Sequence, residues 1–187
     1  MSYNRVSLAI IGLVALSIAV VSFWSFRLPY AAVSCLLGWF MLAIAVSDAS
    51  RFIIPDILSL PLIPTGLLAV YFLQCADGDP SLVLEHLGAA AFGAALLFSV
   101  RAVYFYWRDR EGLGLGDVKL GAVAGAWTGF QGMTNVLLVG CILALSSIAA
   151  TMLWQRRLLP GTTALPFGIF LAGAIWMVWF AGALATS

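Results

Sequence analysis

Charge is scarce in this sequence. Of its 187 residues, 9% are Asp, Glu, Lys or Arg, whereas 63% are hydrophobic. A soluble domain typically carries about a quarter charged residues, so there is too little polar surface here to coat a globule in water. We therefore expect lipid to be the solvent, and a polytopic all-α membrane protein to be the fold class.

The sequence also has almost no excess of basic residues, no cysteine motif and a single histidine. The net charge is +1, and a nucleic-acid partner would need a basic patch, so we expect none. Cys35, Cys75 and Cys141 form no CxxC or zinc-type spacing, so neither a disulfide framework nor a structural metal is indicated. No serine or cysteine nucleophile has a plausible base beside it, and we expect the single histidine, His86, to be structural.

Long apolar runs are what the chain has instead. A membrane-spanning helix needs about 20 mostly apolar residues. About seven runs approach this length, at residues 7–26, 30–46, 57–74, 82–107, 117–130, 136–154 and 165–184. We find no internal repeat and no soluble domain. We therefore expect one membrane domain over 1–187.

The sequence divides this domain at two further places, after an N-terminal helix and at a turn near the C-terminal third. Residues 1–29 read as an extra anchor helix, retained rather than cleaved as a signal peptide because no small-residue cleavage pattern follows; the core is then 30–187. We expect a turn at 131–135, between the runs 117–130 and 136–154.

The basic residues predict the orientation, since cytoplasmic loops are enriched in Lys and Arg. With about seven alternating spans and a cytoplasmic N-terminus, Arg27 is the one basic residue on the external side of the membrane. Arg101 lies within a span, near its cytoplasmic end. The others all fall on the cytoplasmic side: Arg5, Arg51, Arg108, Arg110, Lys119, Arg156 and Arg157. Both polar stretches that interrupt the apolar runs then face the cytoplasm.

Each polar stretch contains an aspartate at the end of an apolar run, Asp48 in the first and Asp117 in the second. Ionised carboxylates at membrane depth are costly and are usually functional. Two carboxylates within a few ångströms cannot both ionise readily, so they share a proton. One can then activate a water while the other protonates a scissile carbonyl. The pair predicts a proteolytic site at the edge of the bilayer that needs no metal and no cofactor.

Glycines surround the second aspartate. Gly114 and Gly116 allow unusual backbone conformations and close approach of a substrate. Gly121, Gly125 and Gly129 follow Asp117 at intervals of four residues and so share one helix face, which is typical of close helix packing in membranes. We expect this face to meet the span 30–46, although another span is possible.

Each charged residue also has an ordinary explanation. Asp117 could cap its helix, and Asp48 could pair with Arg51. Lys119 could be an interfacial anchor as readily as an active-site residue. Asp56, which follows a proline, could cap the next helix.

Two alternative functions are also open. The first is a small proton-coupled transporter or channel that uses the two aspartates as proton carriers. Such proteins typically place their acids near the bilayer midplane in repeated halves, and no repeat is found here. The second is an inactive assembly subunit, against which the two retained aspartates argue.

Three segments together resemble the type IV prepilin peptidases, which are aspartic membrane proteases of the GxGD type. The likeness covers about residues 37–174 and rests on these segments: Asp48 followed by Pro55-Asp56, Gly114-Leu-Gly116-Asp117-Val-Lys119, and Leu165-Pro166-Phe167-Gly168-Ile-Phe170. The second resembles the family's GxGD-x-K segment, and the third its Pro-Phe-Gly-x-Phe segment.

The resemblance implies cleavage of a short basic leader from prepilin or pseudopilin substrates of type IV pili or protein secretion. It implies that Asp48 and Asp117 are the catalytic pair, and we expect Pro55, Asp56, Gly114, Gly116 and Lys119 to support the site. It also implies a multi-pass protein of the bacterial inner membrane, with N-terminus and active site cytoplasmic. Many members carry paired cysteines in an N-terminal cytoplasmic loop. The connector 26–30 has none, so we expect a short, peptidase-only form that lacks N-methyltransferase activity.

Overall fold

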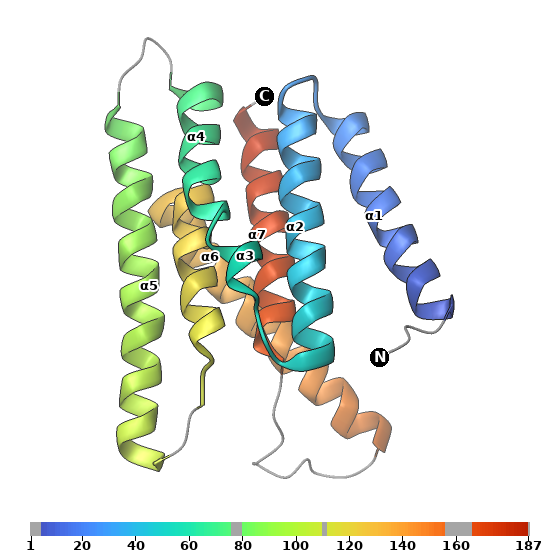
Figure 1. The fold of residues 1–187 in the computed structure, drawn as a ribbon, viewed down its shortest axis with the longest axis vertical. Coiled ribbons are helices and arrows are strands. Elements are labelled where there is room, and N and C mark those ends of the chain that lie inside the picture. Colours follow the sequence, from blue (N-terminus) through green and yellow to red (C-terminus); the bar gives the residue numbers. More distant parts are fainter. Residues whose placement is uncertain (1–4, 76–79, 110–111, 156–165, 187) are drawn as a thin grey trace.

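The protein is a bundle of α-helices (Figure 1). A computed structural model describes residues 5–75, 80–109, 112–155 and 166–186. The helices within these ranges are α1 (Arg5–Ser25), α2 (Tyr30–Arg51), α3 (Asp56–Ser59), α4 (Leu62–Gln74), α5 (Ser81–Arg108), α6 (Leu115–Gln155) and α7 (Phe167–Thr186). These ranges contain no strand, which confirms the all-α fold class. Arg110, Glu111, Arg156, Arg157 and Leu165 lie outside the described residues.

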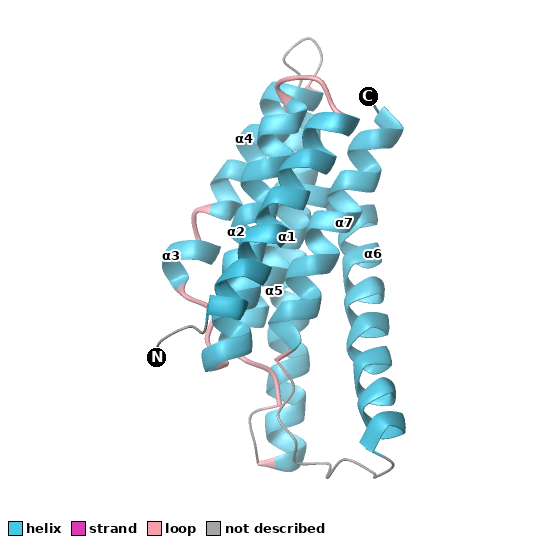
Figure 2. Cartoon of the chain, turned by 90° about the vertical axis from the view of Figure 1, so that its right-hand side faces the viewer, coloured by secondary structure: helices cyan, strands magenta, loops and turns pink. Residues whose placement is uncertain are grey.

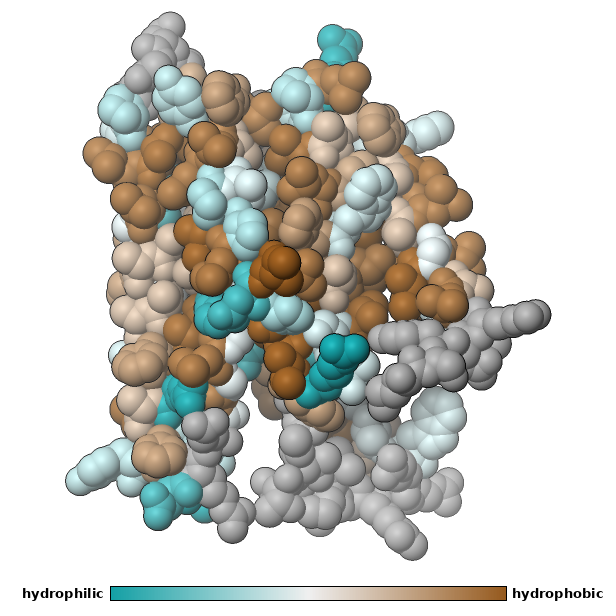
Figure 3. Space-filling model, in the orientation of Figure 1, coloured by the Kyte–Doolittle hydropathy of each residue, from teal (hydrophilic) through white to brown (hydrophobic). Residues whose placement is uncertain are grey.

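Six helical segments of the described chain are long and apolar enough to cross a membrane, by length and composition. Figure 3 shows apolar side chains over most of one face, with hydrophilic side chains gathered mainly towards its lower end. One segment, Asp56–Gln74, contains both α3 and α4. The expected single helix is divided there because Pro61 has no N–H to continue the helical hydrogen bonds.

The count of six differs from about seven because α6 is one long helical element of 41 residues. Gly129 interrupts it with φ 65° and ψ −172°, a backbone conformation that glycine adopts readily. The two halves of α6 therefore run in opposite directions (Figure 1), and they correspond to the runs expected at 117–130 and 136–154. The turn predicted at 131–135 is wrong in position, because the reversal occurs at Gly129 and these residues are helical.

Two side chains of α5 complete the backbone hydrogen bonds at this reversal. In an uninterrupted helix the N–H of Phe130 would bond the carbonyl of Ala126. Here the N–H of Phe130 donates to Glu85 Oε1 at 2.9 Å, and His86 Nδ1 donates to the Ala126 carbonyl at 3.1 Å. His86 is buried, and its other ring nitrogen lies 3.4 Å from Glu85 Oε2. His86 therefore has the structural role expected from the sequence.

Replacement of Glu85 tests this arrangement. Glu85→Ala leaves the N–H of Phe130 without its acceptor, and we expect it to lower the free energy of unfolding by about 1–3 kcal/mol. Glu85→Gln keeps an amide oxygen at the same place and is the matched control, with a smaller loss. Thermal unfolding in detergent micelles measures both. Equal stabilities of the Ala variant and the wild type would contradict this account of the reversal.

The core lies between α2, α6 and α7, because α2 and α6 each pack against α7 (Figures 1 and 2). Of the membrane-spanning segments, α1 is the least buried. Trp127 of α6 is almost fully buried, and its indole N–H donates to the Leu62 carbonyl at 2.7 Å. Its ring lies against Gly66 of α4. These contacts fix α4 on α6. The C-terminal end of α2 and the start of α6 lie at the same end of the bundle (Figure 1).

Candidate functional site

The two aspartates predicted from the sequence line one cavity of about 300 Å³. Asp48 lies in the last turns of α2, which extends to Arg51, and Asp117 lies in the first turn of α6. Both side chains are buried, with 6% and 8% of their surface exposed. The cavity is lined by Asp48, Phe52, Ile53, Ile54, Asp56, Gly114, Leu115, Gly116, Asp117 and Lys119. Residues far apart in the sequence thus meet at one end of the bundle.

One carboxylate oxygen of Asp117 is hydrogen-bonded at the start of its own helix, and the other is not hydrogen-bonded within the described part of the chain. Its Oδ2 accepts a hydrogen bond from the N–H of Gly114 at 3.3 Å. This is the contact that an acid at the third helical position makes with the capping residue. A role in capping the helix therefore explains the position of Oδ2 only. The other oxygen, Oδ1, is buried and has no hydrogen-bond partner among the described residues. Buried acceptors usually bind a protein group or a water, so this oxygen is available to a water or to a substrate group.

Asp48 is oriented by α7. Its Oδ2 accepts a hydrogen bond from the N–H of Ile169 at 3.1 Å, in the first turn of α7, where unpaired N–H groups are available to an anion. A β-carbon on the preceding Gly168 would lie 2.8 Å from the same oxygen, so only glycine leaves room for it. The sequence left open an ion pair between Asp48 and Arg51. In the structure, the carboxylate of Asp48 instead accepts a hydrogen bond from α7.

Sequence reasoning missed Ile169, whose N–H binds Asp48, and the apolar residues of the cavity wall, Phe52, Ile53, Ile54 and Leu115. The Pro-Phe-Gly segment indicated the region through its resemblance to a family, but no role followed from the residue types. A backbone N–H is provided by every residue except proline, so the sequence carries no signal for which one reaches Asp48.

The segment between α2 and α3 forms one wall of the cavity. Ser47 Oγ donates to the carbonyl of Ile53 at 2.8 Å. Pro55 is extended and precedes α3, and the carboxylate of Asp56 forms an ion pair with Lys119 of α6. The expectation that Asp56 caps α3 is wrong, because Pro55 occupies the cap position without a side-chain hydrogen bond and Asp56 pairs with Lys119 instead.

The glycine face of α6 meets a different neighbour from the expected one. A β-carbon on Gly121 would lie 2.8 Å from Gly93 of α5, and Gly125 lies against the backbone of Ala89 and Ala90. Gly129 lies beside Glu85 and His86. The prediction that this face packs on the span 30–46 is therefore wrong. The close approach is to α5, and α6 meets the cavity through its first residues, as far as Lys119.

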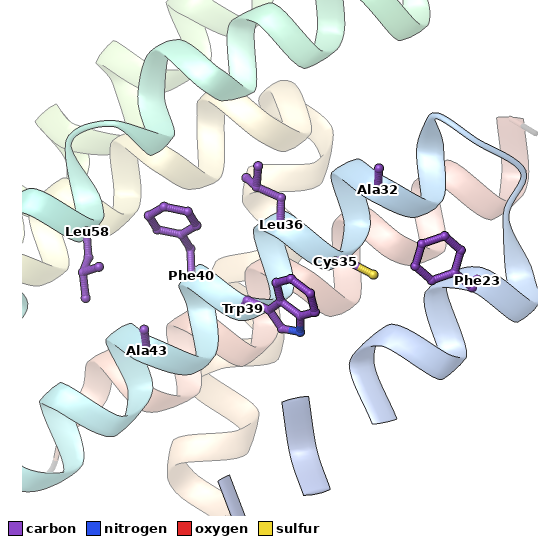
Figure 4. A pocket seen from close by; sticks show the side chains of 8 residues that line it. All are labelled: Phe23, Ala32, Cys35, Leu36, Trp39, Phe40, Ala43 and Leu58. Atoms are coloured by element: carbon purple, nitrogen blue, oxygen red, sulfur yellow. The ribbon is translucent and has the colours of Figure 1, made fainter. Parts of the chain in front are cut away.

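A larger apolar cavity, of about 590 Å³, lies along the outer side of α2 (Figure 4). Figure 4 shows Phe23 of α1 at one end and Leu58 of α3 at the other, with the remaining lining side chains on α2. Its lining includes no carboxylate or amine, so it offers no group for acid or base chemistry. Within the described residues, no group of three or more His, Cys, Asp or Glu side chains is placed to hold a metal ion.

Comparison with known proteins gives a consistent result. The model of the type IV leader peptidase family matches residues 35–149, a range that contains both aspartates. The chain is similar to the prepilin leader peptidase/N-methyltransferase of Pseudomonas aeruginosa, with 34% identity over 155 residues that cover 82% of this chain and 51% of the relative. The protein of that name from Dickeya chrysanthemi is 37% identical over 139 residues, which cover 73% of this chain and 46% of the relative.

A third relative of the same name, from Xanthomonas campestris, is 31% identical over 168 residues, which cover 88% of this chain and 55% of the relative. The chain thus spans about half the length of the curated relatives it matches. No solved structure is found to match it.

Proposed function

Because the chain belongs to the type IV leader peptidase family, we propose that it is an aspartic endopeptidase that removes leader peptides from prepilins or pseudopilins. The observation that carries this proposal is the meeting of Asp48 and Asp117 in one cavity at one end of a membrane bundle. Two carboxylates that share a proton supply both a base and an acid, which are the groups that peptide hydrolysis by water requires. The titration belongs to the pair, so neither role is assigned to one residue.

The chemistry follows the pattern of paired carboxylates. The ionised carboxylate takes a proton from a water molecule, whose oxygen attacks the carbonyl carbon of the scissile peptide bond. The protonated carboxylate gives its proton to the carbonyl oxygen. Collapse of this intermediate breaks the C–N bond. The leaving amine takes the proton that the first carboxylate received from water, and a hydroxyl of the intermediate returns its proton to the second carboxylate, which restores the pair. The unpartnered Oδ1 of Asp117 is the atom available to the water or to the substrate carbonyl.

A cleavage assay tests the proposal. Membranes that contain this chain are mixed with a prepilin, and the product is measured by mass spectrometry, which locates the cut. We expect the mature chain to appear and the leader to be released, whereas membranes without this chain leave the prepilin intact. A correctly inserted, thermally stable protein that leaves every supplied prepilin and pseudopilin uncut would contradict the proposal.

We also propose that the site opens at the cytoplasmic face of the bacterial inner membrane. Arg51, Arg108 and Lys119 lie at the same end of the bundle as the two aspartates, and Arg27 lies at the opposite end (Figure 1). Basic residues concentrate on the cytoplasmic side of membrane proteins. The distribution among the described residues therefore supports this orientation.

Cysteine labelling of intact cells tests the orientation. We expect Leu28→Cys to react with a membrane-impermeant maleimide from outside, and Asp109→Cys to react after the cells are opened. Cys75 and Cys141, which are not buried, are first replaced by serine. Labelling of Asp109→Cys in intact cells would place the aspartates on the outer side.

A further inference from the structure

Ile54 lies between the start of α6, which carries Asp117, and the start of α7, which binds Asp48. It is 7% exposed and belongs to the segment between α2 and α3. A β-carbon on Gly116 would lie 2.7 Å from Cβ of Ile54, and one on Gly168 would lie 2.8 Å from its Cδ1. The side chain of Ile54 therefore lies along the backbone just before Asp117, and its Cδ1 also reaches the backbone just before Ile169, the residue that orients Asp48.

The segment that carries Ile54 is tied to both aspartate helices. On the α2 side, the N–H of Phe52 donates to the carbonyl of Asp48 at 2.9 Å, and Ser47 Oγ donates to the carbonyl of Ile53. Phe52 has a left-handed backbone with φ 54°, which turns the chain across the end of α2. The position of Ile54 is thus linked to that of Asp48.

The other side of the segment is tied to α6. Pro55 restricts the residue before it to extended conformations, which limits the directions that Ile54 can take. Asp56 then pairs with Lys119, two residues after Asp117. An ion pair with partly exposed members adds little stability, but it fixes the register of the segment against α6.

We propose that Ile54 is a positioning residue that sets the separation of Asp48 and Asp117. The inference rests on the proposed function and concerns the same site. Packed interiors respond to the loss of even one methylene, so a shorter side chain lets the first turns of α6 and α7 move towards the space it leaves. A displacement of about 1 Å in a catalytic group can cost about a hundredfold in rate. Ile54 has no group for acid or base chemistry, and it acts through the glycines beside it.

A graded series of variants tests this role by steady-state cleavage of a prepilin. Ile54→Val removes Cδ1, which lies beside both Gly168 and Gly116, and Ile54→Ala also removes the remaining branches. We expect Ile54→Ala to lower kcat by about tenfold to a hundredfold with little change in KM, and Ile54→Val to lie between it and the wild type. The matched control is Ile175→Ala in α7, a fully buried isoleucine outside the cavity, which we expect to lower thermal stability while kcat is kept.

A distance measurement separates this inference from the proposed function. Asp48→Cys and Asp117→Cys are combined in a chain whose three native cysteines are replaced, and are cross-linked with reagents of increasing length. We expect Ile54→Ala to change the length that reacts best, and Ile175→Ala to leave it unchanged. This readout needs no activity, so a wild type that cuts no prepilin would overturn the proposed function alone. Unchanged kcat and an unchanged cross-linking length in Ile54→Ala would overturn the positioning role.

Discussion

Asp48→Asn and Asp117→Asn are each expected to lower the rate of prepilin cleavage by about 10²- to 10⁴-fold, the usual contribution of a positioned acid or base. The asparagine oxygen can still accept the hydrogen bond from Ile169 or from Gly114 that each aspartate receives in the structure. The amide cannot take or give the proton, however. The change therefore removes the chemistry of each group and retains its main local contact.

The double variant sharpens this test. The proposed mechanism uses the two carboxylates as one unit, and effects within a catalytic unit are not additive. We therefore expect the double variant to be no slower than the slower single variant. Glu85→Gln is the matched control, an acid-to-amide change at the reversal of α6, and should cleave at the wild-type rate. Either aspartate variant processing its substrate normally would remove that residue from the mechanism.

Gly168→Ala is expected to have the next largest effect, a loss of about a hundredfold in kcat. The added methyl group would lie 2.8 Å from both Asp48 Oδ2 and Ile54 Cδ1, too close for either to stay in place. The carboxylate must then move away from the N–H of Ile169. Alanine favours helix over glycine by about 1 kcal/mol, so the damage should appear mainly in the rate.

Gly173→Ala provides the comparison on the same helix. A β-carbon at Gly173 meets no atom within 4 Å, so this variant gains helix propensity without a clash. We expect wild-type cleavage and equal or greater thermal stability. If Gly168→Ala and Gly173→Ala cleave equally fast, the contact between α7 and Asp48 has no part in catalysis.

The sequence was sufficient to predict the membrane bundle and the meeting of two aspartates. Asp48 and Asp117 end and begin apolar runs in a chain with few charges, and alternating spans put such positions at one end of a bundle. That inference needed only the length of a spanning helix. It did not need to know which helices touch.

Which helices contact one another could not be predicted from the sequence. The glycine face of α6 indicates close packing, but glycines at intervals of four fit any partner helix, and the partner is α5. The reversal in α6 was assigned to polar residues near 131–135, because a turn is usually polar. Its place is Gly129, where Glu85 and His86 of another helix supply the missing hydrogen bonds.

The hydrogen bond from Ile169 to Asp48 has a consequence for biogenesis. The two residues are 121 positions apart, and ribosomes make the chain from its N-terminus. Both aspartates are therefore synthesised before the donor that orients one of them exists. The packing of α7 against the other helices is then the step that completes the site.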